Sequence, residues 1–170
     1  MIRPIVLFGE GVLEKPAERV QHITDDEVKL VQDMIETMYK APGVGLAANQ
    51  VGVGKRIMVT DPSAGEKRNQ LITIVNPEIV SSEGEQYEEE GCLSVPGFSA
   101  EVVRPKTVVI RGVDLDGKEV IVEGSDLLAR AFCHEMDHLN GKFFLDHLSF
   151  IKRDIIKRRI RKMMRDGKWE

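Results

Sequence analysis

Apolar residues recur along the chain at two spacings, which predict helices in some stretches and strands in others. The clearest helical stretch runs from about Asp25 to Lys40, after an N-cap at Thr24 and a capping-box residue at Glu27. A second predicted helix begins after a cap at Ser125 and ends near Asn140, and a third begins at about Leu148. Shorter runs rich in Val, Ile and Thr predict strands between these helices.

The predicted strands are short and are separated by turn residues. The Asp116-Gly117 pair is a hairpin signal, and strands that are joined by a tight turn are antiparallel. We therefore expect an α+β fold with mostly antiparallel sheets packed around a central helix, one helix near the N-terminus and one at the C-terminus. The predicted strands cover residues 57–60, 71–75, 101–104, 107–115 and 118–122.

Length and charge fit one mildly acidic globular domain. The chain has 170 residues and a formal net charge of -4. Its Lys and Arg residues are concentrated after Ser149, so the last helix has a basic face and an apolar face. That helix either exposes its basic face to water or docks on RNA, and the charge pattern does not separate the two.

Neither a secretion signal nor a membrane span is predicted. The apolar run Ile5–Phe8 is broken by Gly9 and Glu10, and no later run approaches the length of a membrane span. The two cysteines, Cys92 and Cys133, do not suggest a disulfide framework. We expect a cytoplasmic protein with no membrane association, in which both thiols are free to bind metal.

The helix that ends near Asn140 carries an H-E-x-x-H pattern. His134 and His138 lie one turn apart on one face, and Glu135 lies roughly 80° from their midline. This arrangement is typical of two metal ligands with a carboxylate beside an open coordination position. An exposed helical turn with two histidines would have the same pattern, so the interpretation depends on a third ligand.

Four residues are candidates for that ligand, because a catalytic zinc-type site usually has three protein ligands and an exchangeable water. Cys133 lies roughly 120° from the histidine midline and points away from a shared metal. His22 and His147 lie in a polar stretch and in a turn, where surface histidines are common. Cys92 follows Gly91 in a separate element and is favoured by spacing alone.

Two more stretches have unusual composition. The glycine-rich segment Gly43–Lys55 does not fit a phosphate loop, because no strand precedes it and Arg56 stands where Ser or Thr would bind magnesium. A flexible connection is the simplest interpretation, in which only Gln50 could both donate and accept at a reaction centre. The run Glu83–Glu90 holds five glutamates and is expected to be a solvated edge or loop.

Three segments, in this order, resemble the signature motifs of peptide deformylases. They are G-V-G-L-A-A-N-Q at 43–50, E-G-C-L-S at 90–94 and H-E-M-D-H at 134–138, and the segment Ile5–Gly9 is similar to the family's opening. One departure is Cys133, because the family often has Gln at that position. We accordingly expect a catalytic unit at residues 1–147 and a basic amphipathic C-terminal helix of the same domain at 148–170.

The resemblance implies a hydrolase that removes the formyl group from the N-terminal N-formylmethionine of nascent polypeptides and releases formate. The metal would be bound by His134 and His138 on the central helix and by Cys92 beside it. Glu135 would act first as base and then as acid. The oxyanion donors would be the Gln50 side chain and the Leu93 backbone N–H. Substrate contacts are expected at Val44, Gly45, Gly91 and Leu127.

The implied cofactor is Fe²⁺, and Zn²⁺, Ni²⁺ or Co²⁺ would suit the same thiolate and imidazole ligands. The implied partners are N-formylmethionyl nascent peptides and, through the basic helix, the ribosome. Arg130 either borders the substrate pocket or is exposed, and Asp137 either supports a histidine or forms an ion pair. Two alternatives are a zinc-dependent H-E-x-x-H peptidase, which normally has a downstream ligand, and a non-catalytic binding module stabilised by a metal with four ligands.

Overall fold

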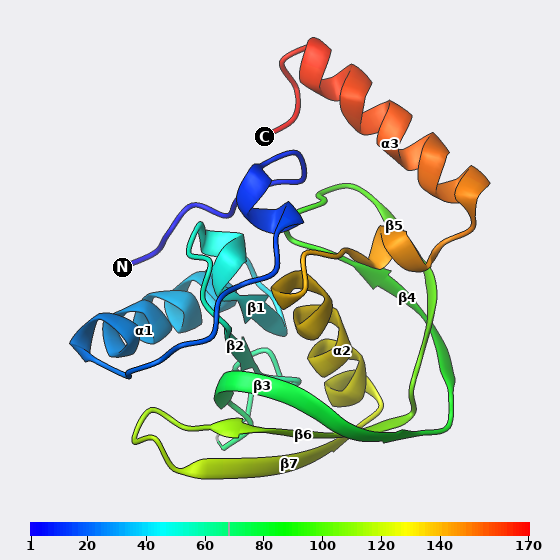
Figure 1. Cartoon of the computed structure of the whole chain (residues 1–170). Helices are drawn as coiled ribbons and strands as arrows, with labels where there is room; N and C mark the ends of the chain where they lie inside the picture. The colour runs from blue at the N-terminus through cyan, green and yellow to red at the C-terminus, as the bar shows by residue number, and fades with distance from the viewer. Residues whose placement is uncertain (68) are drawn as a thin grey trace.

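The computed structural model describes residues 1–67 and 69–170 and has the expected α+β fold (Figure 1). Its α-helices are α1 (Asp25–Lys40), α2 (Leu127–Leu139) and α3 (Phe150–Arg165), and its 3-10 helices are η1 (Gly11–Glu14), η2 (Ala48–Val51) and η3 (Phe144–His147). Its strands are β1 (Gly45–Ala47), β2 (Ile57–Thr60), β3 (Ile72–Glu83), β4 (Gln86–Gly91), β5 (Ser99–Arg104), β6 (Thr107–Val113) and β7 (Glu119–Ser125).

The strands form two antiparallel sheets. The larger sheet has the order β1-β2-β3-β6-β7, and β4 pairs with β5 in a separate sheet. The Asp116-Gly117 turn joins β6 to β7 as expected, and Gly117 has a φ of +78°, a conformation that glycine adopts without strain. The prediction of mostly antiparallel sheets is confirmed.

Helix α1 begins and ends at the predicted residues. The Thr24 side chain caps the first turn, and the Glu27 carboxylate accepts a hydrogen bond from the Thr24 backbone N–H at 2.8 Å. The apolar face of α1 packs against β1, β2 and η2 through a buried cluster that includes Leu30, Met34 and Leu46. The helix therefore supports the segment that runs from β1 to η2.

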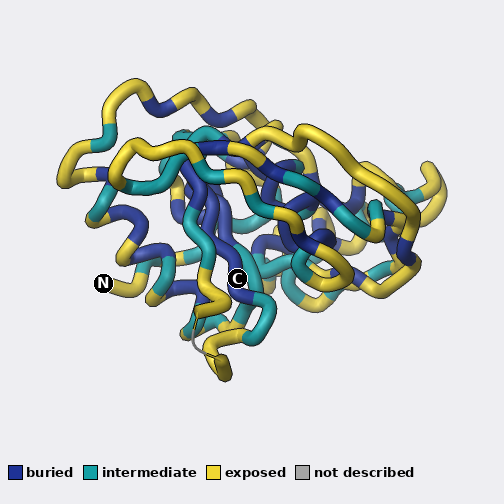
Figure 2. The backbone as a smooth tube through the Cα atoms, turned by 90° about the horizontal axis from the view of Figure 1, so that it is seen from below, coloured by how far each residue is buried: buried dark blue, intermediate teal, exposed yellow. Residues whose placement is uncertain are grey.

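Helix α2 lies between the larger sheet and the β4–β5 sheet (Figure 1). Its residues Phe132 and Leu139 share a buried cluster with Ile74 and Ile110 of the larger sheet. Gly124 of β7 permits the close packing, because a Cβ there would lie 2.9 Å from a carbon of the Phe132 ring. Buried backbone is concentrated in the middle of the molecule (Figure 2), and the buried residues of α2 include the polar Arg130, Glu135 and His138.

Three local predictions were wrong. The segment Gly43–Lys55 is not only a loop, because β1 pairs with β2 and η2 follows directly. The run Glu83–Glu90 contains most of β4, and Glu90 is buried rather than solvated, since its strand places it against α2. Ser125 ends β7, and the N-cap of α2 is Asp126, which has a φ of +57°.

Helix α3 packs against the body only in part. Ile160 is buried, whereas Ile151 and Ile155 are 70% and 48% exposed. Ser149 caps the helix by accepting from the Lys152 backbone N–H. Within the described ranges, no helix combines the length and the apolar character needed to cross a membrane.

Candidate metal centre

Two imidazoles and one thiol converge at the same face of α2. His134 and His138 direct their Nε2 atoms to within 3.1 Å of each other. Cys92, in the loop after β4, places its Sγ 3.2 Å from the His138 Nε2. The three ligand atoms all lie within 4.8 Å of one another. The structure therefore brings Cys92 to the two histidines, as the sequence analysis favoured.

The tautomer of His134 is fixed by a buried carboxylate. Its Nδ1 lies 2.6 Å from Oε2 of Glu90, which also accepts from Nη2 of Arg104 at 2.7 Å, while Oε1 accepts from Nη1 of Arg130 at 2.8 Å. Burial alone would raise the pKa of Glu90, but the hydrogen bonds from His134 and Arg104 hold this pKa well below its usual range. The ionised carboxylate only accepts hydrogen bonds, so His134 Nδ1 carries a proton and Nε2 is the ring nitrogen that faces the cluster.

The arginine network continues from Glu90 toward the surface. Arg104 donates from Nη1 to Oδ2 of Asp137 at 2.8 Å, and Nε2 of His147 lies 2.7 Å from the same oxygen. Asp137 is thus an ion-pair residue, and His147 lies with this network rather than with the ligand cluster. Arg130 is buried and borders the cavity. This network was not predicted from the sequence, where a glutamate two residues before Cys92 was its one local signal.

The donor set fits a transition-metal ion. A thiolate and two neutral imidazoles suit Zn²⁺, Ni²⁺, Co²⁺ and Fe²⁺. Burial lowers the pKa of His138 well below its ordinary value, so His138 is neutral and can donate a lone pair. Among the residues that the structure describes, no fourth His, Cys, Asp or Glu joins Cys92, His134 and His138. A metal held by these three residues would keep an open coordination position.

Glu135 lies beside the ligand cluster with one oxygen free. The residue is 2% exposed, and its Oε2 is buried without a hydrogen-bond partner within residues 1–67 and 69–170. Burial raises the pKa of Glu135 to about 7. Gly45 makes room for this side chain, because a Cβ at position 45 would lie 3.1 Å from both Cγ and Cδ of Glu135.

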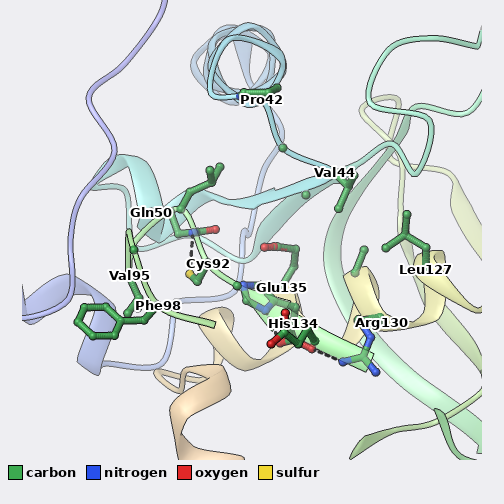
Figure 3. Close-up of a pocket in the computed structure, with 18 residues that line it drawn as sticks. Pro42, Val44, Gln50, Cys92, Val95, Phe98, Leu127, Arg130, His134 and Glu135 are labelled. Atoms are coloured by element: carbon green, nitrogen blue, oxygen red, sulfur yellow. Dashed lines mark hydrogen bonds and ion pairs between the residues drawn. The ribbon is translucent and has the colours of Figure 1, made fainter. Parts of the chain in front are cut away.

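The Gln50 amide is oriented by hydrogen bonds on both of its ends. Its Oε1 accepts from the Ala47 backbone N–H at 3.0 Å, and its Nε2 donates to Oγ of Ser94 at 3.1 Å. The same Nε2 lies 3.8 Å from Sγ of Cys92, so the amide faces the ligand cluster (Figure 3). Ser94, which positions this amide, was not identified as a site residue from the sequence.

The cluster opens into a cavity of about 460 Å³ (Figure 3). Leu127 and Phe98 lie at opposite ends of the close-up, with Cys92 and Glu135 between them. The residues expected to contact substrate or an oxyanion all line this cavity: Val44, Gly45, Gln50, Gly91, Leu93 and Leu127. Phe98 and Val95 also line it and were not predicted.

The other candidate ligands lie elsewhere. Cys133 is buried and packs with Val108 and Ala129, and burial raises the pKa of its thiol to about 11. This thiol stays protonated at neutral pH and is a packing residue. His22 lines a separate surface hollow near Asn76. Of the two cysteines, only Cys92 belongs to the cluster.

Known proteins resemble this chain along almost its whole length. The family model described as Polypeptide deformylase matches residues 2–154. A peptide deformylase of Acidobacterium capsulatum is 50% identical over 169 residues, which cover 99% of both chains. A peptide deformylase of Thermodesulfovibrio yellowstonii is 47% identical over 160 residues, which cover 94% of this chain and 97% of that relative. The crystal structure of a peptide deformylase from Legionella pneumophila matches with a TM-score of 0.90 and 44% identity, over 100% of this chain and 99% of its own.

Proposed function

The chain belongs to the polypeptide deformylase family, and on that premise we propose that this hydrolase removes the formyl group from N-formylmethionine at the start of nascent polypeptides. The products are formate and a peptide with a free amino group. The observation that carries the proposal is the buried Glu135 carboxylate, whose unpaired oxygen lies beside the cluster of Cys92, His134 and His138. An amide carbonyl is a weak electrophile, so its hydrolysis needs an activated water and a proton donor for the leaving amine.

Cys92, His134 and His138 would hold the metal, for which we propose Fe²⁺, with Zn²⁺, Ni²⁺ and Co²⁺ as substitutes. When bound, such an ion acidifies water and polarises a carbonyl. Glu90 supports this role, because its contact with Nδ1 orients the His134 ring and leaves Nε2 as the nitrogen for the metal. Glu90 therefore supports the same ion that the thiolate and the imidazoles would bind.

Glu135 would move the proton during hydrolysis. It takes a proton from the attacking water and passes it to the amine nitrogen as the C–N bond breaks. A pKa of about 7 suits a group that must both accept and donate a proton near neutral pH. Its burial also keeps bulk water from competing for the free Oε2.

The developing oxyanion would be stabilised by the Gln50 amide and the Leu93 backbone N–H. Both residues line the cavity beside Cys92, and the hydrogen bonds to Ala47 and Ser94 already orient the amide. Donors that are in place before the reaction need no reorganisation when charge develops. Because Gln50 is 1% exposed and already oriented, we assign it the role of oxyanion donor.

The substrate would enter the cavity as an extended peptide. β1 is the last strand at one end of the larger sheet, so its outer edge is available for pairing with a peptide backbone. The methionine side chain would lie toward Val44 and Leu127, while Gly91 offers little steric hindrance beside the backbone. The charge of Arg130 is neutralised there by Glu90, which keeps this end of the cavity suitable for an apolar side chain.

A formate-release assay tests the function. Protein purified without oxygen and loaded with Fe²⁺, Ni²⁺ or Co²⁺ is expected to release formate from a formyl-Met peptide, without cleaving internal peptide bonds. The E135Q variant should retain its metal and lose turnover by about 100-fold or more, because it cannot take up the proton. Internal cleavage would favour a peptidase, and an absence of formate with every metal would favour a non-catalytic module.

The ribosome is the proposed docking partner of α3. Its basic residues include the exposed Arg159 and Lys162, and RNA phosphates attract such a surface. Co-sedimentation with ribosomes should weaken steeply as salt rises, because phosphate contacts release counterions. A double substitution of Arg159 and Lys162 by glutamate should weaken the co-sedimentation at a fixed salt concentration. The control Lys118→Glu in the β6–β7 turn should not weaken it. Ribosome binding that does not change with salt concentration would contradict docking through the basic face of α3.

A further inference from the structure

Trp169, the single tryptophan of the chain, is folded back onto the body after α3. The segment that follows the helix returns toward the N-terminal segment (Figure 1). There the Trp169 Nε1–H donates to the backbone oxygen of Phe8 at 2.9 Å, and its ring lies 6.3 Å from the Phe98 ring at an interplanar angle of 54°. Trp169 thus contacts two segments that are distant in the sequence.

Both contacts act on the loop that carries Cys92. The last β4–β5 pair is Gly91 with Ser99, so residues 92–98 form the loop between these strands, and Phe98 closes it opposite Cys92. The Phe8 backbone N–H donates to the Ser94 backbone oxygen at 2.8 Å in the middle of the same loop. Trp169 therefore holds the loop directly at Phe98 and indirectly at Ser94.

Phe98 belongs to the wall of the cavity near its mouth. It is partly exposed and neighbours the exposed Gly97, whereas Glu135 and the ligand His138 are buried. The formyl group must reach the buried cluster, and the methionine side chain is proposed to lie toward Leu127 at the opposite end (Figure 3). A peptide that leaves the cavity at the end away from Leu127 would pass Gly97 and Phe98, which line the cavity.

We propose that Trp169 is a positioning residue that holds Phe98 as an apolar wall for the substrate residues after the methionine. This inference rests on the proposed deformylase function and adds to it that Trp169, through Phe98, sets how strongly the substrate residues after the methionine are bound. Aromatic pairs of this geometry contribute enough to change an affinity several-fold.

The test compares kcat and KM for N-formylmethionine and formyl-Met-Leu-Phe in the metal-loaded, full-length enzyme. Trp169→Ala should lower the ratio of kcat/KM for the long substrate to that for the short one by about three- to ten-fold, mainly through KM. Trp169→Phe keeps an aromatic ring and should lower this ratio less. Lys168→Ala, an exposed neighbour on the same segment, is the matched control and should leave the ratio unchanged.

Two further measurements separate positioning from general stability. Phe98→Ala should lower the same ratio, and the double variant with Trp169→Ala should be no worse than either single variant, because the two residues act as a unit. Titration of the wild type with the product peptide Met-Leu-Phe should change the fluorescence of Trp169, and Phe98→Ala should abolish the change.

The outcomes distinguish the two proposals. An enzyme that releases formate but whose substrate ratio is unchanged by Trp169→Ala would overturn the role of Trp169 and leave the function intact. Failure of the wild type to release formate from either substrate would overturn the function. In that case the fluorescence titration still tests the positioning role of Trp169. A fluorescence that does not change when Met-Leu-Phe is added would overturn this role.

Discussion

A single carboxylate connects a histidine of the candidate metal site to two buried cations. Glu90 contacts His134, Arg104 and Arg130, and each of these four side chains belongs to a different turn or strand of the fold. Two buried guanidinium groups near one carboxylate leave a net positive surplus, which Asp137 offsets through its bond to Arg104. The network is therefore complete only when all of its members are present, and loss of one would leave a buried charge without its partner.

Glu90→Gln tests this network at the level of one residue. The substitution keeps the size of the side chain but removes the charge that holds the proton on His134 Nδ1 and compensates the arginines. We expect metal affinity to fall by about 10- to 100-fold, measured by competition with a chelator. Glu88→Gln, at an exposed position of the same strand, is the matched control. Equal affinity in Glu90→Gln and the wild type would show that the carboxylate does not support the ligand.

The sequence alone predicts the site residues that depend on local spacing. The geometry of one helix predicts that His134, Glu135 and His138 lie close together. The same geometry predicts that Cys133 points away from them, and Cys133 does lie outside the cluster. The environment of Glu90 could not be predicted in this way, because its partners in β5 and α2 lie 14 to 44 residues later in the chain. A glutamate in a charged run has the same local sequence whether it is solvated or meets two arginines.

At the scale of elements, α1 owes its defined start to one capping box that is also tied to a distant loop. Glu27 accepts from the Thr24 backbone N–H and forms an ion pair with Lys55 at 2.7 Å. The hydrogen bonds from Lys55 and Thr24 lower the pKa of Glu27 from 4.5 to about 2. Because the folded-state pKa is depressed, the carboxylate contributes stability above about pH 4.5, and this contribution is lost as the pH falls toward 2.

Glu27→Gln should therefore be less stable than the wild type at pH 7, and the difference should disappear between pH 4.5 and 2. Urea unfolding at a series of pH values measures this. Asp26→Asn, an exposed acidic neighbour in the same turn, is the control and should show a much smaller difference at pH 7. A difference between Glu27→Gln and the wild type that stays constant down to pH 2 would contradict the role of the ionised carboxylate.

Elements with a strong local signal were predicted to the residue, and elements stabilised only by partners were missed. The bounds of α1 and β2 match, because a capping box and a run of four buried residues are encoded locally. β1 has three residues and exists through its pairing with β2. Among the described residues, β4 pairs with β5 alone, and its Glu88 and Glu89 side chains are exposed. This charged strand therefore has a composition that is typical of a loop.

At the scale of the whole molecule, the ligand cluster joins two parts of the fold. His134 and His138 belong to α2, which packs on the larger sheet, whereas Cys92 belongs to the loop between β4 and β5 of the smaller sheet. A metal bound by all three residues would link the two sheets through α2. Since an unfolded chain holds these ligands far apart, the binding energy would add to the stability of the folded state.

Metal removal and replacement therefore offer a test on the intact protein. Adding Ni²⁺ to metal-free protein at about 100 times its dissociation constant should add about 2.7 kcal/mol, which raises the melting temperature by roughly 5–10 °C for a chain of this size. Cys92→Ser should lose most of this increase because it removes the thiolate. Cys133→Ala should keep the increase, although its starting melting temperature will be lower by the loss of buried volume. Equal metal-induced increases in Cys92→Ser and the wild type would show that the two sheets are not joined through this thiol.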